Sequence, residues 1–173
     1  MCIRDSTLIV QGLYQFKPEL PFSPGSDIAG VVKAVGEGVK NVKVGDEVFG
    51  LVNHGGFAEE VVVPAKMVFP KMPMMNYKIA ASFMMAYGTS YHALKDRAKL
   101  KEGETLLVLG ASGGVGIAAV ELGKLMGARV IAAASTDTKL ELCEKYGADE
   151  TINYSKENLK NRIKELTLSL IHI

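Results

Sequence analysis

The sequence predicts an α/β chain in two parts, and three observations support this prediction. In the first part, short runs rich in valine and isoleucine alternate with glycine turns, as in an antiparallel β domain. In the second part, the apolar run at residues 106–109 has charge before it and glycine after it, which is typical of a parallel strand buried on both faces. A glycine-rich turn at residues 110–116 then leads into apolar residues at helical spacing. Strand, turn and helix together form the first half of a nucleotide-binding βαβ unit.

The β part opens with a proline-rich loop and continues as several short strands separated by glycine turns. The expected strands are residues 28–35, 39–44, 47–49 and 57–63. Pro64 ends the last of them, because proline cannot donate to a strand ladder. A helical region dense in alanine, methionine and leucine is expected over residues 76–95.

The glycine-rich turn has the features that a bound dinucleotide requires. Gly113 lets backbone amides approach a pyrophosphate, and Gly116 lets the helix pack closely on the strand. The helix start, at Gly114 and Val115, supplies unpaired amides and the positive end of the helix dipole. Ala111 stands where the first glycine of Gly-x-Gly-x-x-Gly would be, so a tight turn that binds nothing is the alternative.

The residues that follow complete the unit and favour nucleotide binding over that alternative. A second apolar run, residues 129–135, is followed by a helix over residues 136–146 that ends at Gly147, as expected for a C-cap glycine. A short strand at residues 150–154 and a helix at residues 156–166 come next. This succession is the context in which a glycine-rich turn binds a dinucleotide.

The two ends of the chain look like one DNA sequence read in both directions. Residues 1–5 can be back-translated into a string whose reverse complement encodes residues 168–173. We therefore interpret residues 1–6 and 168–173 as translated sequencing adapter and exclude them from fold reasoning. The natural sequence is then expected over residues 7–167, cut by DNA fragmentation rather than at a domain boundary.

The composition is that of an ordinary globular protein. The 173 residues are 48% hydrophobic and 23% charged, and the net charge is +1, which gives no electrostatic case for binding nucleic acid or an anionic membrane surface. Outside the adapter segments the one cysteine is Cys143, which excludes a disulfide framework and is expected to be a buried apolar residue. The longest apolar run, at residues 79–86, is too short to cross a membrane, so a cytoplasmic location is expected.

Four ordered motifs together are more specific than the glycine turn alone. They are Pro-Gly-Ser-Asp-Ile-Ala-Gly at residues 24–30, Val-Gly-Asp-Glu-Val at 44–48, Gly-Thr-Ser-Tyr-His-Ala-Leu at 88–94, and the turn at 110–116. In these motifs the chain resembles the zinc-free NADPH:quinone oxidoreductase family of the medium-chain dehydrogenase/reductase superfamily.

The resemblance covers essentially all of residues 7–167 and implies two domains. A GroES-like domain with its linking helix would occupy residues 7–95, and the first half of a Rossmann sheet would occupy residues 96–167. The active site would lie in the cleft between them. The start of the first domain and the later half of the second would be missing. A small-molecule substrate and a homodimeric parent protein are also implied.

The side chains available as ligands indicate whether the chain can bind a catalytic zinc ion. Zinc-dependent members of the superfamily place His-Glu where this chain has Ser26 and Asp27, and a catalytic zinc needs three protein ligands. The natural segment has two imidazoles, His54 in a glycine turn and His92 on a helix, and both are interpreted as surface or packing residues. We expect no metal, and hence reduction of quinones or conjugated carbonyls rather than interconversion of simple alcohols.

The end of the second parallel strand favours NADPH over NADH. NAD-specific units place an acid there, whereas this strand ends at Ser135, which leaves room for a 2′-phosphate. Lys139 lies one helical turn further on and can supply positive charge, although a solvated helix lysine is the alternative. Tyr154 matches a tyrosine that contacts the 2′-phosphate in the family. Asp137 argues the other way, because its charge would repel a phosphate.

The expected chemistry is hydride transfer from the nicotinamide, with no catalytic side chain assigned. Thr89 corresponds to a family position near the nicotinamide, and a helix-start cap is its alternative. The substrate-side tyrosine of several quinone reductases falls at Leu8, so the proton donor is unassigned. Three functions stay open: a reductase of quinones or α,β-unsaturated carbonyls, an enoyl-thioester reductase, and a non-catalytic NADPH-binding protein. The chain as given is expected to be inactive and poorly soluble, because its sheet edges are open.

Overall fold

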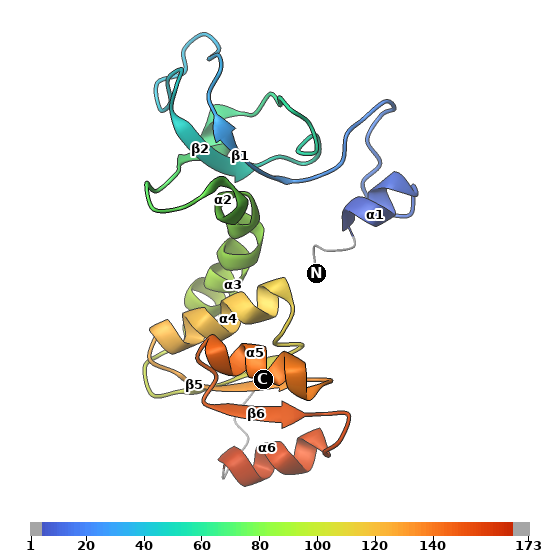
Figure 1. The fold of residues 1–173 in the computed structure, drawn as a ribbon, viewed down its shortest axis with the longest axis vertical. Helices are drawn as coiled ribbons and strands as arrows, with labels where there is room; N and C mark the ends of the chain where they lie inside the picture. Colours follow the sequence, from blue (N-terminus) through green and yellow to red (C-terminus); the bar gives the residue numbers. More distant parts are fainter. Residues whose placement is uncertain (1–4, 168–173) are drawn as a thin grey trace. The chain divides into compact units, whose positions relative to one another are not determined.

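The computed structural model describes residues 5–167, and the chain divides into two compact units after Met85 (Figure 1). The adapter interpretation falls mostly on residues 1–4 and 168–173, which lie outside the described residues. Of the adapter segments only Asp5 and Ser6 are described, and they begin the short helix α1 (Asp5–Val10).

The first unit is built on a three-stranded antiparallel sheet in the order β1-β2-β3. Its strands are β1 (Asp27–Val31), β2 (Glu47–Leu51) and β3 (Val68–Pro70). The ring of Phe49 lies against those of Phe69 on β3 and Phe83 on helix α2, with ring centroids 6.1 Å and 5.9 Å away. The prediction of an antiparallel β domain is confirmed.

Three strand assignments from the sequence are wrong in detail. Residues 39–44 and 57–63 form no strand, and β1 ends at Val31 rather than at residue 35. A valine-rich segment forms a strand only where a partner supplies hydrogen bonds, and neither of these segments pairs with a strand of the sheet; the side chain of Val62 is 98% exposed. The sequence also missed β3, because its short length and its Pro70 hide the signal; an edge strand tolerates such a proline.

A succession of helical turns occupies residues 77–97, as the sequence predicted. It consists of α2 (Tyr77–Phe83), the π-helical η3 (Met84–Gly88), α3 (Thr89–Tyr91) and the π-helical η4 (His92–Arg97). Asn76 caps α2, because its Oδ1 accepts a hydrogen bond of 2.9 Å from the Ile79 amide.

The second unit contains a parallel sheet in the order β4-β5-β6, which confirms the predicted half-Rossmann fold. The strands are β4 (Thr105–Leu109), β5 (Arg129–Ala134) and β6 (Glu150–Asn153), and the helices are α4 (Gly114–Leu125), α5 (Asp137–Lys145) and α6 (Leu159–Thr167). The three strands and α5 begin and end within two residues of their predicted bounds, and α4 begins at Gly114, as predicted. Helix α6 begins three residues later than predicted.

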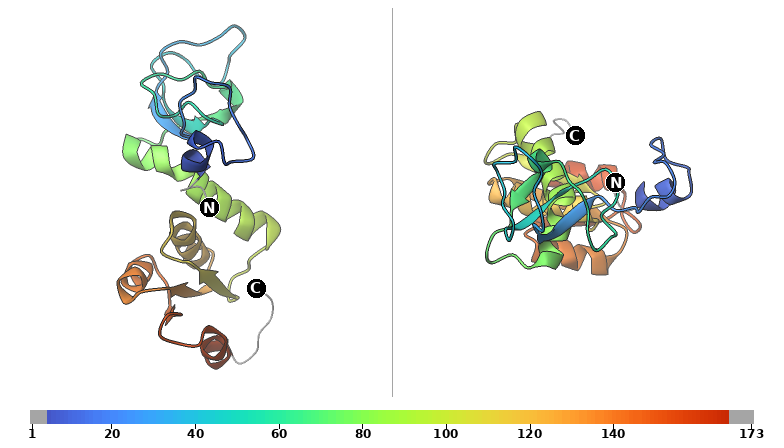
Figure 2. Two further views of the ribbon diagram at one scale, coloured as in Figure 1. Left: turned by 90° about the vertical axis from the view of Figure 1, so that its right-hand side faces the viewer. Right: turned by 90° about the horizontal axis from the view of Figure 1, so that it is seen from above.

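Helices cover both faces of this sheet, with α4 and α5 on one face and α6 on the other (Figures 1 and 2). Alternate residues of β5 divide between the two faces. Val130 and Ala132 pack with Val120 of α4 and Cys143 of α5, whereas the intervening residues of β5 pack with Ile163 of α6 and its neighbours. Consecutive crossovers on one face are what right-handed βαβ connections produce. Cys143 is fully buried, as predicted.

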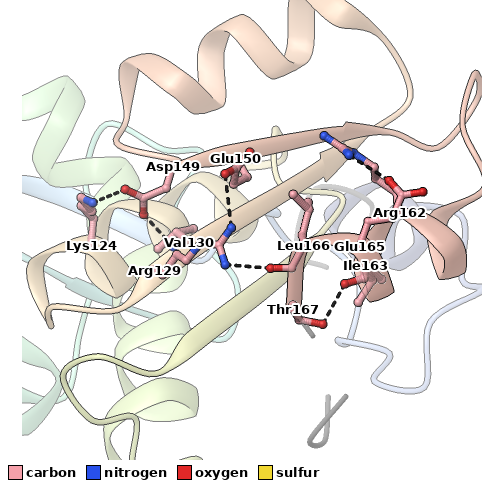
Figure 3. A network of polar contacts seen from close by, with 10 residues as sticks. All are labelled: Lys124, Arg129, Val130, Asp149, Glu150, Arg162, Ile163, Glu165, Leu166 and Thr167. Carbon is pink, nitrogen blue, oxygen red and sulfur yellow. Dashed lines mark hydrogen bonds and ion pairs between the residues drawn. The ribbon is translucent and has the colours of Figure 1, made fainter. Parts of the chain in front are cut away.

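Polar contacts hold together the amino ends of β5 and β6 (Figure 3), whereas the glycine-rich turn follows the carboxyl end of β4. The Arg129 guanidinium donates to the Leu166 carbonyl at 2.8 Å and lies 3.2 Å from a Glu150 carboxylate oxygen. The Asp149 carboxylate accepts from the Val130 amide at 2.8 Å and pairs with Lys124 of α4. These contacts fix α6 and β6 to β5 and leave the carboxyl ends of the strands for binding.

Candidate nucleotide-binding site

The glycine-rich turn joins the carboxyl end of β4 to the start of α4. Gly110 has a φ of +62°, which glycine adopts without strain, and the Gly113 amide donates to its carbonyl at 3.0 Å. Gly113 is the N-cap of α4, and no side chain caps the helix. The amides of the first turn have no acceptor within the helix and are therefore available to an anion.

Two glycines of this turn meet different surroundings. A Cβ on Gly116 would lie 2.5 Å from the Gly110 carbonyl oxygen and 2.8 Å from the Ala111 Cα, so only glycine allows this approach of α4 to the strand end. A Cβ on Gly114 would meet nothing within 4 Å, so the space beside the helix start is open. The structure thus supports the packing role that the sequence assigned to Gly116.

Ser90 is a residue of this site that sequence reasoning missed. It is 2% exposed, and its hydroxyl donates a 2.8 Å hydrogen bond to the carbonyl of Val115 in the first turn of α4. The contact ties α3 to the glycine-rich turn. A serine beside Thr89 in an apolar helical segment was the available signal, since buried hydroxyls in such segments must find acceptors.

A second contact fixes the same helical segment to α4. The Tyr87 hydroxyl donates to the carboxylate of Glu121. Burial, and then this carboxylate, raise the pKa of Tyr87 to about 12. The phenol therefore stays protonated near neutral pH and acts as an anchor.

The carboxyl end of β5 brings together the three residues predicted to bind a 2′-phosphate. The Lys139 ammonium lies 3.1 Å from the Ser135 hydroxyl, one turn along α5. Tyr154 follows β6, its amide donates to the Ala134 carbonyl at 3.2 Å, and its ring is partly exposed. The carboxyl end of β5 thus places a hydroxyl beside an ammonium, and the backbone of Tyr154 lies next to this strand end.

The carboxylate of Asp137, whose charge was expected to repel a phosphate, is bound by two other side chains. Its Oδ1 accepts from the Asn153 side-chain amide at 2.6 Å, and its Oδ2 pairs with the Lys156 ammonium. The hydrogen bond from Lys156, followed by that from Asn153, holds the pKa of Asp137 below its usual value. Its negative charge is therefore compensated locally.

Thr89 is the first residue of α3, and its alternative role as a helix-start cap is wrong. Gly88 before it is already helical, with φ −61° and ψ −44°, so Thr89 lies inside the helical succession. Its proposed contact with a nicotinamide stays a prediction.

Neither histidine of the described residues lies in a cluster of potential metal ligands. The His54 ring packs between Phe16 and Phe22, with centroids 5.9 Å and 6.1 Å away, and His92 pairs with Asp96 at 2.8 Å on an exposed helical face. Residues 5–167 contain no group of three His, Cys, Asp or Glu side chains placed to hold a metal ion.

Asp27, at the position of a zinc-site residue in related dehydrogenases, makes a structural contact. Its Oδ1 accepts a 3.1 Å hydrogen bond from the Met85 amide. Burial raises the pKa of Asp27, against the effect of this bond. In this chain the Asp27 carboxylate thus binds the backbone of η3.

Comparison with known proteins places the chain in a family. The model for the alcohol dehydrogenase GroES-like domain matches residues 1–73, and the model for zinc-binding dehydrogenases matches residues 114–172. A quinone oxidoreductase-like protein 2 homolog from Nematostella vectensis is 43% identical over 158 residues, which cover 90% of this chain and 43% of that protein. The chain belongs to the medium-chain dehydrogenase/reductase superfamily. The resemblance to quinone oxidoreductases of this superfamily, inferred from the four motifs, is thereby confirmed, and the absence of zinc stays a prediction.

Two solved structures are similar to this superfamily member over almost its whole length. The Escherichia coli quinone oxidoreductase complexed with NADPH is 34% identical, with a TM-score of 0.87, and the match covers 94% of this chain and 50% of that one. The CurK enoyl reductase is 28% identical, with a TM-score of 0.84, over 94% of this chain and 51% of that one. The chain thus spans about half the length of the relatives it matches. In the part that the structure describes, no helix has the length and apolar composition to cross a bilayer.

Proposed function

We propose that the protein containing this chain is an NADPH-dependent oxidoreductase that transfers hydride to a quinone or an α,β-unsaturated carbonyl compound. The observation that carries the proposal is the pairing of Ser135 with Lys139 at the carboxyl end of β5. A dinucleotide whose pyrophosphate lies on the start of α4 extends its adenosine ribose toward this end of the second strand. A lysine and a hydroxyl are suited to a phosphate there, whereas an NAD-specific site has an acid.

The residues of the turn fit the pyrophosphate. Gly114, Val115 and Gly116 would hold it through backbone amides, because Gly114 leaves open space and α4 starts without a side-chain cap. Gly113, whose own amide is bonded to the Gly110 carbonyl, would let the pyrophosphate approach because it has no Cβ. Ser135, Lys139 and Tyr154 would hold the 2′-phosphate, and Thr89 would lie near the nicotinamide. The similar Escherichia coli enzyme was solved with NADPH, which supports this assignment.

The bound cofactor would supply the hydride, and the chain would orient it and exclude water. We propose that the reaction proceeds without zinc. This is supported by the engagement of His54, His92 and Asp27 in packing, an ion pair and a helix contact. The substrate carbonyl would then be polarised by hydrogen bonds, which suits conjugated acceptors. The proposal includes a small-molecule substrate and a cytoplasmic homodimer, which chromatography with light scattering and cell fractionation would test.

The similarity to the CurK enoyl reductase supports a second candidate, reduction of an enoyl thioester. Both candidates are conjugate reductions, so the same nucleotide site serves either. They differ in the acceptor, which the described residues do not distinguish.

Two measurements on the full-length protein test the proposal. Titration with NADPH and NADH should give tighter binding of NADPH, and equal affinities would contradict the assigned cofactor. Oxidation of NADPH should then be followed with a panel of quinones, enones and enoyl thioesters. Turnover of an enoyl thioester alone would favour the second candidate, and tight NADPH binding without turnover would indicate a non-catalytic binding protein.

A further inference from the structure

The carboxylate of Asp137 is a feature of the β5 end that disfavours a phosphate. Asp137 is the first residue of α5 and lies two residues after Ser135, so their Cα atoms are at most about 7 Å apart. An unpaired carboxylate there would repel a 2′-phosphate. It could also accept a hydrogen bond from the free 2′-hydroxyl of an unphosphorylated ribose, as the strand-end acid of NAD-specific units does.

The last residue of β6 and a residue of the loop after it bind this carboxylate. Asn153, 4% exposed, donates its side-chain amide to Oδ1 at 2.6 Å, and Lys156 pairs its ammonium with Oδ2. They come 16 and 19 residues later in the chain. The contact therefore depends on the pairing of β6 with β5.

The loop that carries Lys156 is itself organised around Asn153. Its Oδ1 accepts from the Ser155 amide at 3.1 Å, its carbonyl accepts from the Glu157 amide at 2.9 Å, and its own amide donates to the Glu157 carboxylate at 3.2 Å. Asn153 thus both binds Asp137 and shapes the turn that presents Lys156. Glu157 is occupied by this bond and by Arg162, which lies 3.5 Å away.

We propose that Lys156, acting through Asp137, determines the preference of this site for a 2′-phosphorylated nucleotide. The inference rests on the proposed function, because it assumes that the adenosine 2′-position lies at the β5 end. Lys156 is a positioning residue: it cancels the charge of Asp137 and directs the carboxylate toward β6, so that the positive charge of Lys139 acts on the phosphate unopposed. The ion pair is exposed on both sides, so it contributes little to stability and its effect should appear in selectivity.

Calorimetric titration of the full-length protein with adenosine 2′,5′-bisphosphate and with 5′-AMP tests this without requiring turnover. In Lys156→Gln at low ionic strength, the Kd for the bisphosphate should rise about three- to fourfold, the size expected for one uncompensated charge acting on a doubly charged phosphate across roughly 7–10 Å of weakly screened water. The Kd for 5′-AMP should stay the same or fall. Lys145→Gln, which removes the same charge at the other end of α5, should change neither constant.

Two further variants identify the mechanism. Lys156→Arg should keep the preference, and Asp137→Asn added to Lys156→Gln should restore it, because no charge then opposes the phosphate. Equal weakening of both ligands in Lys156→Gln, or an unchanged ratio of the two constants, would overturn the inference. A wild-type protein that binds both ligands equally would instead refute the proposed function itself.

Discussion

Replacing Gly116 with alanine should destabilise the second unit, although alanine is the better helix former. The added Cβ would lie 2.5 Å from the Gly110 carbonyl oxygen and 2.8 Å from both the Cα and the carbonyl oxygen of Ala111. All three atoms belong to the backbone and cannot rotate away as the end of a side chain can. The start of α4 would therefore have to move away from the end of β4.

Two opposing effects set the size of the change. Alanine gains about 1 kcal/mol over glycine inside a helix. Forcing a methyl group into a packed contact costs about 1–3 kcal/mol, and the three short backbone contacts of Gly116 indicate a cost at the upper end. We expect the free energy of unfolding to fall by about 2 kcal/mol.

The matched control is Gly114→Ala, two residues earlier in the same helix. Its Cβ would meet no atom within 4 Å, so the helix preference for alanine acts alone and stability should be unchanged or higher by up to about 1 kcal/mol. Urea unfolding followed by far-UV circular dichroism would measure both variants of the full-length protein. If Gly116→Ala proved as stable as Gly114→Ala, the result would contradict the close backbone contact between the start of α4 and the end of β4.

Three other predictions concern contacts of the second unit. Ser90→Ala should lower the free energy of unfolding by about 1–2 kcal/mol in urea titrations, because the Val115 carbonyl loses its buried donor, and an unchanged value would refute that contact. Arg129→Met should speed hydrogen exchange in α6 but not in α4, because the guanidinium binds a carbonyl at the end of α6. The pKa of Asp149 is lowered by Lys124 and then by a backbone amide, so its stabilising contribution is present above the unfolded pKa near 3.8 and is lost as pH falls through the lower folded value. Asp149→Asn should therefore destabilise the protein at neutral pH and reduce the loss of stability below pH 4, as pH-dependent unfolding would measure.

The second unit could be predicted from the sequence because its signals are local. Strands β4 and β5 are apolar runs with charge before them, and helices α4 and α5 end at Gly127 and Gly147, which have φ of +80° and +100°. Given the order β4-β5-β6, the handedness of βαβ connections places α4 and α5 on the same face. The late start of α6 is explained by Asn158, whose side chain accepts from the Asn161 amide at 3.1 Å in the manner of an N-cap.

For the first unit, the sequence predicted the antiparallel β class but not the individual strands. Its strands depend on partners distant in sequence: β2 pairs with β1 about 20 residues before it and with β3 about 20 residues after it. Valine-rich residues 57–63 have as strong a local pattern as β2 but no strand ladder. Local pattern cannot tell these cases apart, because pairing decides them.

The same distinction between local and distant contacts explains what the sequence could say of the site. Ser135 and Lys139 are one helical turn apart, so their proximity could be expected from spacing alone. The sequence could not reveal that Asp137 is held by Lys156 and Asn153, because that contact needs β6 in register beside β5.

The departure of the turn from the usual glycine pattern also has a structural explanation. Ala111, which replaces the first glycine, is fully buried, packs in the core beneath α4, and donates its amide to the Ala133 carbonyl at 3.1 Å. Its methyl group thus fills space in the core, whereas a Cβ on Gly114 would meet nothing within 4 Å. The position where a side chain is impossible is Gly116, where backbone meets backbone. The turn therefore keeps the glycine that its close packing requires, and its first position can carry alanine without obstructing the amides that would receive a phosphate.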